Sequence, residues 1–123
     1  MVEATKNRLK GHHISFKNAF AGLVYVFKTQ PNFLVHAIAT FIVLFLAAFL
    51  GVTIAEFTLL VFAIVIVLTA EMLNTAIEAL TDMVSPDWHE KAKIAKDVSA
   101  GMVLVAAVGS STIGILIFGK YLI

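Results

Sequence analysis

The sequence contains no cysteine and few charged residues, and both absences limit what it can encode. Without cysteine, a disulfide scaffold and a thiolate metal site are excluded. Charged residues make up 14% of the 123 residues, against about 25% in soluble domains, whereas apolar residues make up 60%. Because so few charges cannot cover a soluble surface of this size, the composition predicts a single domain embedded in a membrane.

The N-terminal segment lacks the continuous apolar run that a cleavable signal peptide needs. Within it, residues 11–29 carry apolar side chains at roughly helical spacing, interrupted by Lys17 and followed by Lys28. This pattern predicts a basic amphipathic helix that lies in the membrane interface. The pattern would also suit a helix that packs on the other helices, and the two roles are compatible.

Three further segments are predicted to form helices that carry membrane spans. They are residues 34–50, 56–83 and 98–120. Pro31 separates the first of them from the preceding helix, because the residue before a proline avoids helical geometry and proline suits a helix start. In the last segment Ala106, Ser110 and Gly114 recur every four residues, a spacing that favours close helix packing in lipid.

The distribution of basic residues predicts how the chain crosses the membrane. Lysine and arginine gather before the first span and between the second and third spans, while the turn between the first two has none. By the positive-inside rule, the N-terminus and the second loop are cytoplasmic and the C-terminus is outside. Only Lys120 opposes this orientation.

One face of the helix at residues 56–83 is polar where a membrane span should be apolar. At about 100° per residue, one stripe holds Glu71, Asn74, Glu78 and Asp82. One interpretation is an interhelical hydrogen-bond network that specifies packing. Two glutamates and an asparagine exceed what helix packing requires, and this favours a catalytic or binding role over a purely structural one. A carboxylate at the membrane boundary can take a proton from a lipid hydroxyl, and a deeper one can hold a divalent metal beside nucleotide phosphates.

Lys96 and Asp97 open the last helix on the same side as this stripe. A lysine there can reach phosphate oxygens, and an aspartate can accept a hydrogen bond from a ribose or a base. Alternatively, the lysine extends to the membrane surface and the aspartate stabilises a helix start. The four histidines show no metal-ligand spacing, so no zinc site is predicted.

The chain closely resembles the prokaryotic diacylglycerol kinase family through two motifs. They are Glu71-Met-Leu-Asn74-Thr-Ala-Ile-Glu78-Ala-Leu-Thr-Asp82 and Ala95-Lys96-Asp97. The Asn-Phe-x-x-His stretch at residues 32–36 resembles the Gram-positive branch, whose members commonly phosphorylate undecaprenol rather than diacylglycerol. The resemblance implies an all-α integral membrane protein with three transmembrane helices and an N-terminal amphipathic surface helix. It further implies a homotrimeric bundle in the bacterial cytoplasmic membrane.

The resemblance also implies a reaction, in which ATP phosphorylates a membrane lipid alcohol with the help of Mg²⁺. Undecaprenol is the first candidate lipid and diacylglycerol the second, active sites are shared between subunits, and no nucleic-acid partner is implied. Glu71 matches the family's general base, and Glu78 matches a metal-binding glutamate. The other implied ATP contacts are Asn18, Gln30, Asp87, Trp88, His89, Lys96 and Asp97, joined by Glu78. The implied substrate or site-shaping residues are Asn74, Ser15 and Ala19.

Two positions depart from the family pattern on the metal and nucleotide side. Gln30 stands where the family carries a second metal-binding glutamate, so it offers a carbonyl oxygen as a weak metal ligand without the charge. A nucleotide-binding arginine of some members aligns near Gly11. These departures leave open a catalytically weak or inactive relative that binds lipid or nucleotide. A small ion-coupled transporter that uses Glu71 as its proton carrier is a further alternative.

Overall fold

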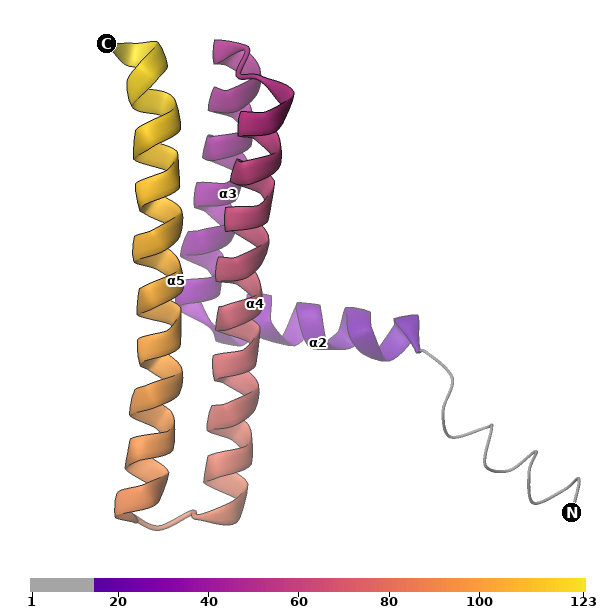
Figure 1. Ribbon diagram of the computed structural model, residues 1–123. Coiled ribbons are helices and arrows are strands. Elements are labelled where there is room, and N and C mark those ends of the chain that lie inside the picture. Colours follow the sequence, from indigo (N-terminus) through magenta and orange to yellow (C-terminus); the bar gives the residue numbers. More distant parts are fainter. Residues whose placement is uncertain (1–14) are drawn as a thin grey trace, which may run out of the picture.

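The computed structural model describes residues 15–123, and this part of the chain consists of helices joined by short connections. They are α2 (Phe16–Thr29), α3 (Pro31–Leu50), α4 (Ile54–Val84) and α5 (Glu90–Leu122). Each of the last three is long and apolar enough to cross a membrane, which confirms the predicted all-α membrane fold with three spans. Figure 1 shows these three side by side, with α2 lying across one end of α3.

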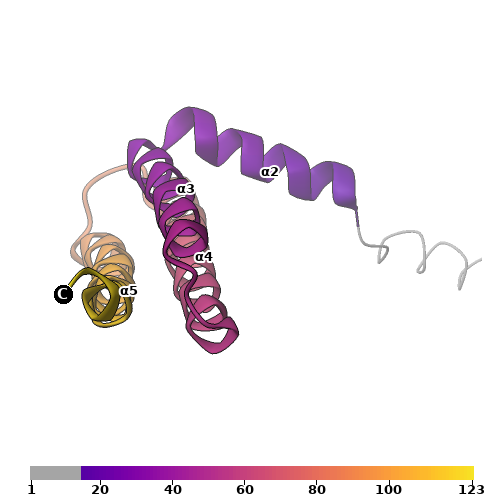
Figure 2. The same cartoon turned by 90° about the horizontal axis from the view of Figure 1, so that it is seen from above.

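Helix α2 begins at Phe16, later than the predicted start at residue 11. Ser15 is its N-cap, because the Ser15 backbone is extended and its side chain accepts a hydrogen bond from the Asn18 backbone N–H at 3.3 Å. Residues 11–14 lie outside the described part of the chain. Most large apolar side chains of α2, including Phe16 and Phe20, are exposed, and Val26 is buried. Seen from above in Figure 2, α2 extends away from the other helices.

The corner between α2 and α3 is built at Gln30 and Pro31. Gln30 has extended backbone angles, and Pro31 occupies the first turn of α3, where its missing N–H costs no hydrogen bond. The rings of Phe27 and Phe33 pack edge to face across the corner, with centroids 4.8 Å apart. This contact holds the end of α2 against the start of α3.

The turn from α3 to α4 depends on one glycine and one capping box. Gly51 adopts φ 65°, a left-handed conformation that side chains disfavour, and it ends α3. Thr53 then caps α4: its hydroxyl accepts from the Glu56 N–H, and the Glu56 carboxylate accepts from the Thr53 N–H. A reversal of two membrane helices is thereby completed within a few residues.

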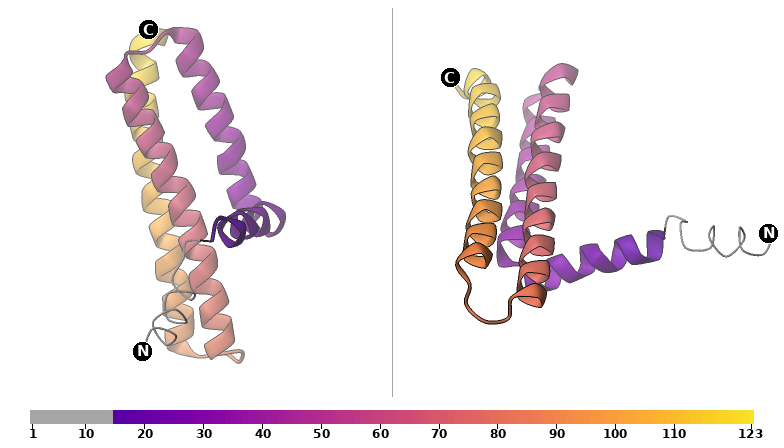
Figure 3. Two further views of the ribbon diagram at one scale, coloured as in Figure 1. Left: turned by 90° about the vertical axis from the view of Figure 1, so that its right-hand side faces the viewer. Right: turned by 60° about the horizontal axis from the view of Figure 1, so that its bottom comes forward.

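Helices α4 and α5 are much longer than α3. At about 1.5 Å per residue, the 20 residues of α3 span about 30 Å, while the 31 residues of α4 span about 46 Å. Both long helices therefore continue past α2 toward residues 85–89, which we call the loop end (Figure 3). α5 begins at Glu90 rather than at residue 98, because His89 caps it by accepting from the Lys91 N–H at 3.1 Å.

The opposite end, near the C-terminus, is closed by a polar contact between α4 and α5. The Glu56 carboxylate lies 2.9 Å from the Lys120 ammonium and accepts a hydrogen bond from the Tyr121 hydroxyl at 2.5 Å. Beside it, Ala47, Leu60 and Ile117 form a small buried cluster from all three spans. This end therefore fixes the register of α5 against α4.

Midway along the span, α5 approaches α4 through its small residues. The Ser110 hydroxyl donates to the Ala63 carbonyl of α4 at 3.0 Å. Next to this contact, an apolar cavity of about 600 Å³ opens between α3, α4 and α5, and its lining includes His36, Thr40 and Ser111. The described residues thus form a tight α4–α5 pair with α3 attached on one side.

Replacing Ser110 with leucine is expected to lower the free energy of unfolding by about 1–3 kcal/mol, because a large side chain forces α5 away from the Ala63 backbone. The matched control is Thr112→Leu, since Thr112 is exposed and its hydroxyl bonds only to the Val108 carbonyl of its own helix. Unfolding in detergent, followed by circular dichroism, measures both variants. Equal stability of the two would contradict the assigned packing.

Candidate functional site

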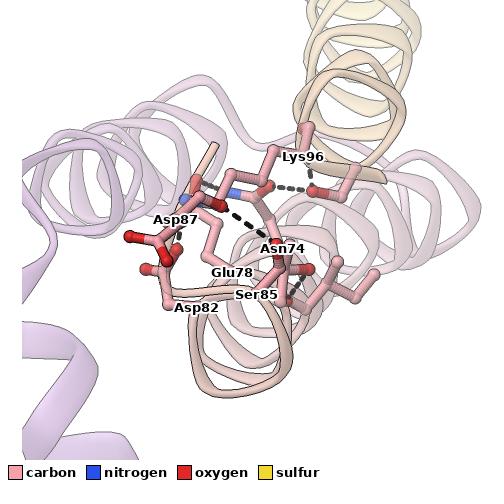
Figure 4. Close-up of polar contacts among 9 residues, drawn as sticks. Asn74, Glu78, Asp82, Ser85, Asp87 and Lys96 are labelled. Carbon is pink, nitrogen blue, oxygen red and sulfur yellow. Dashed lines mark hydrogen bonds and ion pairs between the residues drawn. The ribbon is translucent and has the colours of Figure 1, made fainter. Parts of the chain in front are cut away.

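The polar stripe of α4 faces the first turns of α5 near the loop end. Asn74, Glu78 and Asp82 follow one another at helical i+4 spacing, and Figure 4 shows their side chains together with Lys96 of α5. Because the two helices run side by side here, one stripe of α4 and one turn of α5 supply the whole group. The structure therefore brings together the predicted residues Asn74, Glu78 and Lys96.

Asn74 is the link between the two helices. Its amide oxygen accepts a hydrogen bond from the Ser99 hydroxyl of α5 at 2.6 Å, and its amide NH₂ donates to Glu78 at 3.4 Å. Ser99 is 3% exposed, so its hydroxyl is shielded from water. Asn74 is thus held by α5 at its oxygen and presents its nitrogen to the Glu78 carboxylate.

Lys96 and Asp97 point to different partners although they are adjacent in sequence. Lys96 forms an ion pair with Asp82 of α4. Asp97 pairs instead with Lys93, one turn earlier in α5, at 2.5 Å. Only Lys96 therefore belongs to the group between the helices, and Asp97 lies on the exposed surface of α5.

Glu71 lies deeper in the molecule than the rest of the stripe and contacts a different helix. The residue is 3% exposed, and its Oε1 atom lies 3.2 Å from Nε2 of His36 in α3. Two turns of helix, about 10 Å along the axis, separate Glu71 from Glu78. Glu71 is thus level with the first turns of α3, while Glu78 lies on the part of α4 that extends beyond the start of α3 toward the loop end.

The three carboxylates of the stripe have three different environments. Glu71 is buried beside a histidine, and Asp82 is neutralised by a lysine. Glu78 is half-buried and accepts only the weak Asn74 amide contact, and no cation from residues 15–123 lies within ion-pair distance. Glu78 is therefore the carboxylate most available to an added cation.

The donor groups present fit a magnesium ion that arrives with phosphates. Residues 15–123 contain no cluster of three or more histidine or acidic side chains that could hold a metal alone. Mg²⁺ commonly binds one or two carboxylates and fills its remaining positions with water and substrate phosphates. The free carboxylate of Glu78 meets that requirement, whereas a dedicated protein cage is absent from the described residues.

The loop-end residues form the connection itself. The Asp87 carbonyl accepts a hydrogen bond from the Ser85 hydroxyl at 3.0 Å, and His89 caps α5. The Trp88 side chain is 80% exposed, so it is free to contact another molecule. These predicted positions lie beyond Asp82, at the tip of the α4–α5 pair.

The predicted residues at the start of α2 lie apart from this group within one chain. Asn18 and Ala19 are exposed near the start of α2, beside the cap residue Ser15, at the end that points away from the bundle in Figure 2. Gln30 lies at the α2–α3 corner, where its side chain donates to Thr29 at 3.3 Å. The position near Gly11 lies outside the described residues.

Two residues of the site were not assigned a role from the sequence. Ser99 follows Lys96 by three residues, so helical spacing could have placed it on the same face of α5. His36 is a polar residue inside an apolar span, which is itself a signal of function or of a polar partner. Neither partner could be identified without knowing how the helices are rotated against one another.

Comparison with known proteins identifies relatives over most of the chain. The family model described as prokaryotic diacylglycerol kinase matches residues 17–118. An undecaprenol kinase of Bacillus subtilis is 38% identical over 113 residues, which cover 92% of each chain. A diacylglycerol kinase of Synechocystis sp. is 39% identical over 102 residues, which cover 82% of this chain and 58% of that protein. A diacylglycerol kinase of Haemophilus influenzae is 33% identical, with coverages of 85% and 90%.

Removing the Ser99 hydroxyl is expected to lower the free energy of unfolding by about 1–2 kcal/mol, because the Asn74 oxygen loses its partner in a half-buried position. The control is Thr81→Val, since the Thr81 hydroxyl bonds only to the Ile77 carbonyl of its own helix. Thermal unfolding in detergent compares Ser99→Ala with this control. If the two variants lose the same stability, the Asn74–Ser99 bond does not link the helices as described.

Proposed function

The chain belongs to the prokaryotic diacylglycerol kinase family, and from this premise we propose that it transfers the γ-phosphoryl group of ATP to a membrane lipid alcohol. Its named relatives are diacylglycerol and undecaprenol kinases, and the chain itself has three helices that can cross a membrane. The assignment of roles within the site rests on one observation: the two glutamates of the stripe have different surroundings. Glu71 is buried at the level of the first turns of α3, whereas Glu78, two turns farther along α4, is available to a cation.

On the lipid side, Glu71 acts as general base. It accepts the proton of the lipid hydroxyl while the hydroxyl oxygen attacks the γ-phosphorus, and the bond from that phosphorus to the ADP oxygen breaks. Burial of Glu71 beside the apolar spans supports this role, because bulk water is largely kept away from the carboxylate. The transport alternative leaves Glu78 and Lys96 without a task.

On the nucleotide side, Glu78 would hold Mg²⁺ and Lys96 would offset phosphate charge. When bound, the ion neutralises charge that develops on the transferred phosphoryl group. Asn74 orients the Glu78 carboxylate through its amide, as the 3.4 Å contact supports. Lys96 exchanges part of its contact with Asp82 for phosphate oxygens, while Asp97 and the loop residues Asp87, Trp88 and His89 contact the nucleoside.

The complete site includes residues from a second copy of the chain in a homotrimer. Ser15, Asn18 and Ala19 lie at the end of α2 that extends away from the stripe of their own chain, which supports a contact with a neighbour. Large exposed apolar side chains on all three spans, and the cavity beside α3 and α5, supply surface for such packing. In this arrangement the N-terminus and the loop end are cytoplasmic.

Undecaprenol is the proposed first substrate and diacylglycerol the second. The relative named undecaprenol kinase aligns with nearly the full length of this chain, whereas this chain spans little more than half of the Synechocystis diacylglycerol kinase. Both lipids present a hydroxyl at the membrane interface. Selection between them then depends on the shape of the surface between α2 and the start of α3.

Substituting Glu71 with glutamine is expected to lower kcat by at least about 10²-fold, because a general base commonly contributes about 10²–10⁴-fold. Conversion of ATP to ADP is measured in mixed micelles with undecaprenol and, in parallel, with diacylglycerol. Glu90→Gln makes the same chemical change at an exposed residue in the first turn of α5 and should retain turnover. If the Glu71→Gln variant turns over as fast as the wild type, Glu71 is not the general base.

Magnesium dependence is expected to change in opposite directions at two positions. Glu78→Gln should raise the Mg²⁺ concentration needed for the half-maximal rate, and Gln30→Glu should lower it by adding a second carboxylate ligand. Titration of the same micellar assay with Mg²⁺ measures both. If the wild type is inactive with both lipids while Gln30→Glu is active, the natural chain is a catalytically impaired member of the family, the alternative that its sequence left open.

A further inference from the structure

His36 is a histidine within an apolar membrane span, and its ring contacts the buried carboxylate of Glu71. The contact joins Nε2 of His36 in α3 to Oε1 of Glu71 in α4 at 3.2 Å. The Glu71 side chain is 4% exposed and that of His36 is 27% exposed. Two helices that otherwise share mostly apolar contacts thus meet here through a pair of titratable groups.

Glu71 needs such a partner because its surroundings offer little else. Among the described residues, Oε1 is buried and lacks a well-aligned hydrogen bond, even though Nε2 lies within ion-pair distance. A buried carboxylate without partners is costly, so a small rotation of the imidazole that aligns its N–H is favoured. The two atoms are therefore close enough for a hydrogen bond, and only the alignment of the N–H is missing.

Other polar and basic side chains of α4 and α5 have partners of their own. The Thr75 hydroxyl donates to the Glu71 backbone carbonyl at 2.9 Å and not to the Glu71 carboxylate. Lys96 is paired with Asp82, and Lys93 with Asp97. Within residues 15–123, His36 is the one basic side chain that lies within ion-pair distance of Glu71.

We propose that His36 is a positioning residue for Glu71 in the phosphoryl transfer. Its Nε2–H donates to Oε1 and fixes the rotation of the carboxylate, which leaves Oε2 to accept the proton of the lipid hydroxyl. This inference rests on the proposed function, because it assigns His36 a task only if Glu71 is the base. It also means that α3, which follows the surface helix, controls the orientation of the group on α4.

The test compares substitutions that keep or remove the donor. His36→Leu keeps the bulk without an N–H and should lower kcat by up to about 10²-fold, since misplacing a reacting group can cost this much. The KM for ATP should stay unchanged, because the nucleotide side is two helical turns away. His36→Gln places an amide N–H near the position of Nε2 and should restore most of kcat.

A purely structural role would give a different pattern. Thr40→Val, one turn along α3, removes a hydroxyl that bonds the His36 carbonyl and should leave kcat and KM close to wild type. The double variant His36→Leu/Glu71→Gln should be no slower than Glu71→Gln alone, because both act on one group. If His36→Gln is as slow as His36→Leu, or if the two effects multiply, His36 does not position Glu71.

The outcomes also separate this inference from the proposed function. A slow Glu71→Gln variant with a fully active His36→Leu variant would overturn the role of His36 and leave the kinase mechanism intact. A fully active Glu71→Gln variant would overturn the base assignment, and the proposal for His36 with it. Circular dichroism in the same detergent verifies that each variant is folded.

Discussion

The pairing of α4 with α5 is the contact on which the rest of the molecule depends. It is fixed at three levels: by Glu56 with Tyr121 at the C-terminal end, by Ser110 against the Ala63 backbone in the middle, and by Asn74 with Ser99 near the loop end. Hydrogen bonds of this kind contribute modestly in a membrane, but three of them along one seam define a single register. That register decides which residues of α5 face the acidic stripe.

With this register fixed, the surroundings of each carboxylate in the stripe are set by the side chain that contacts it. The same side-chain type is buried beside a histidine at Glu71, lightly bonded at Glu78 and neutralised by a lysine at Asp82. Environment rather than residue identity therefore divides one stripe into parts suited to different chemistry. The proposed kinase mechanism uses this division by separating lipid activation from phosphate binding along one helix.

Much of the fold could be predicted from the sequence because apolar runs and Pro31 mark the spans directly. The stripe could be predicted as well, since its spacing is a property of one helix. The start of α5 at Glu90 was missed because the cap at His89 resembles ordinary loop chemistry. The partners Ser99 and His36 could not be paired with Asn74 and Glu71, because that pairing depends on the relative rotation of separate helices.

The difference in length between α3 and α4 has a consequence for the membrane itself. Glu71 is tied to the second turn of α3, so its height is set by a helix that matches about 30 Å of hydrocarbon. A thicker bilayer would have to thin locally or draw this carboxylate inward, and a thinner one would tilt the spans. The lipid composition of the host membrane would therefore change the distance between the hydroxyl of a lipid alcohol and Glu71, the proposed base.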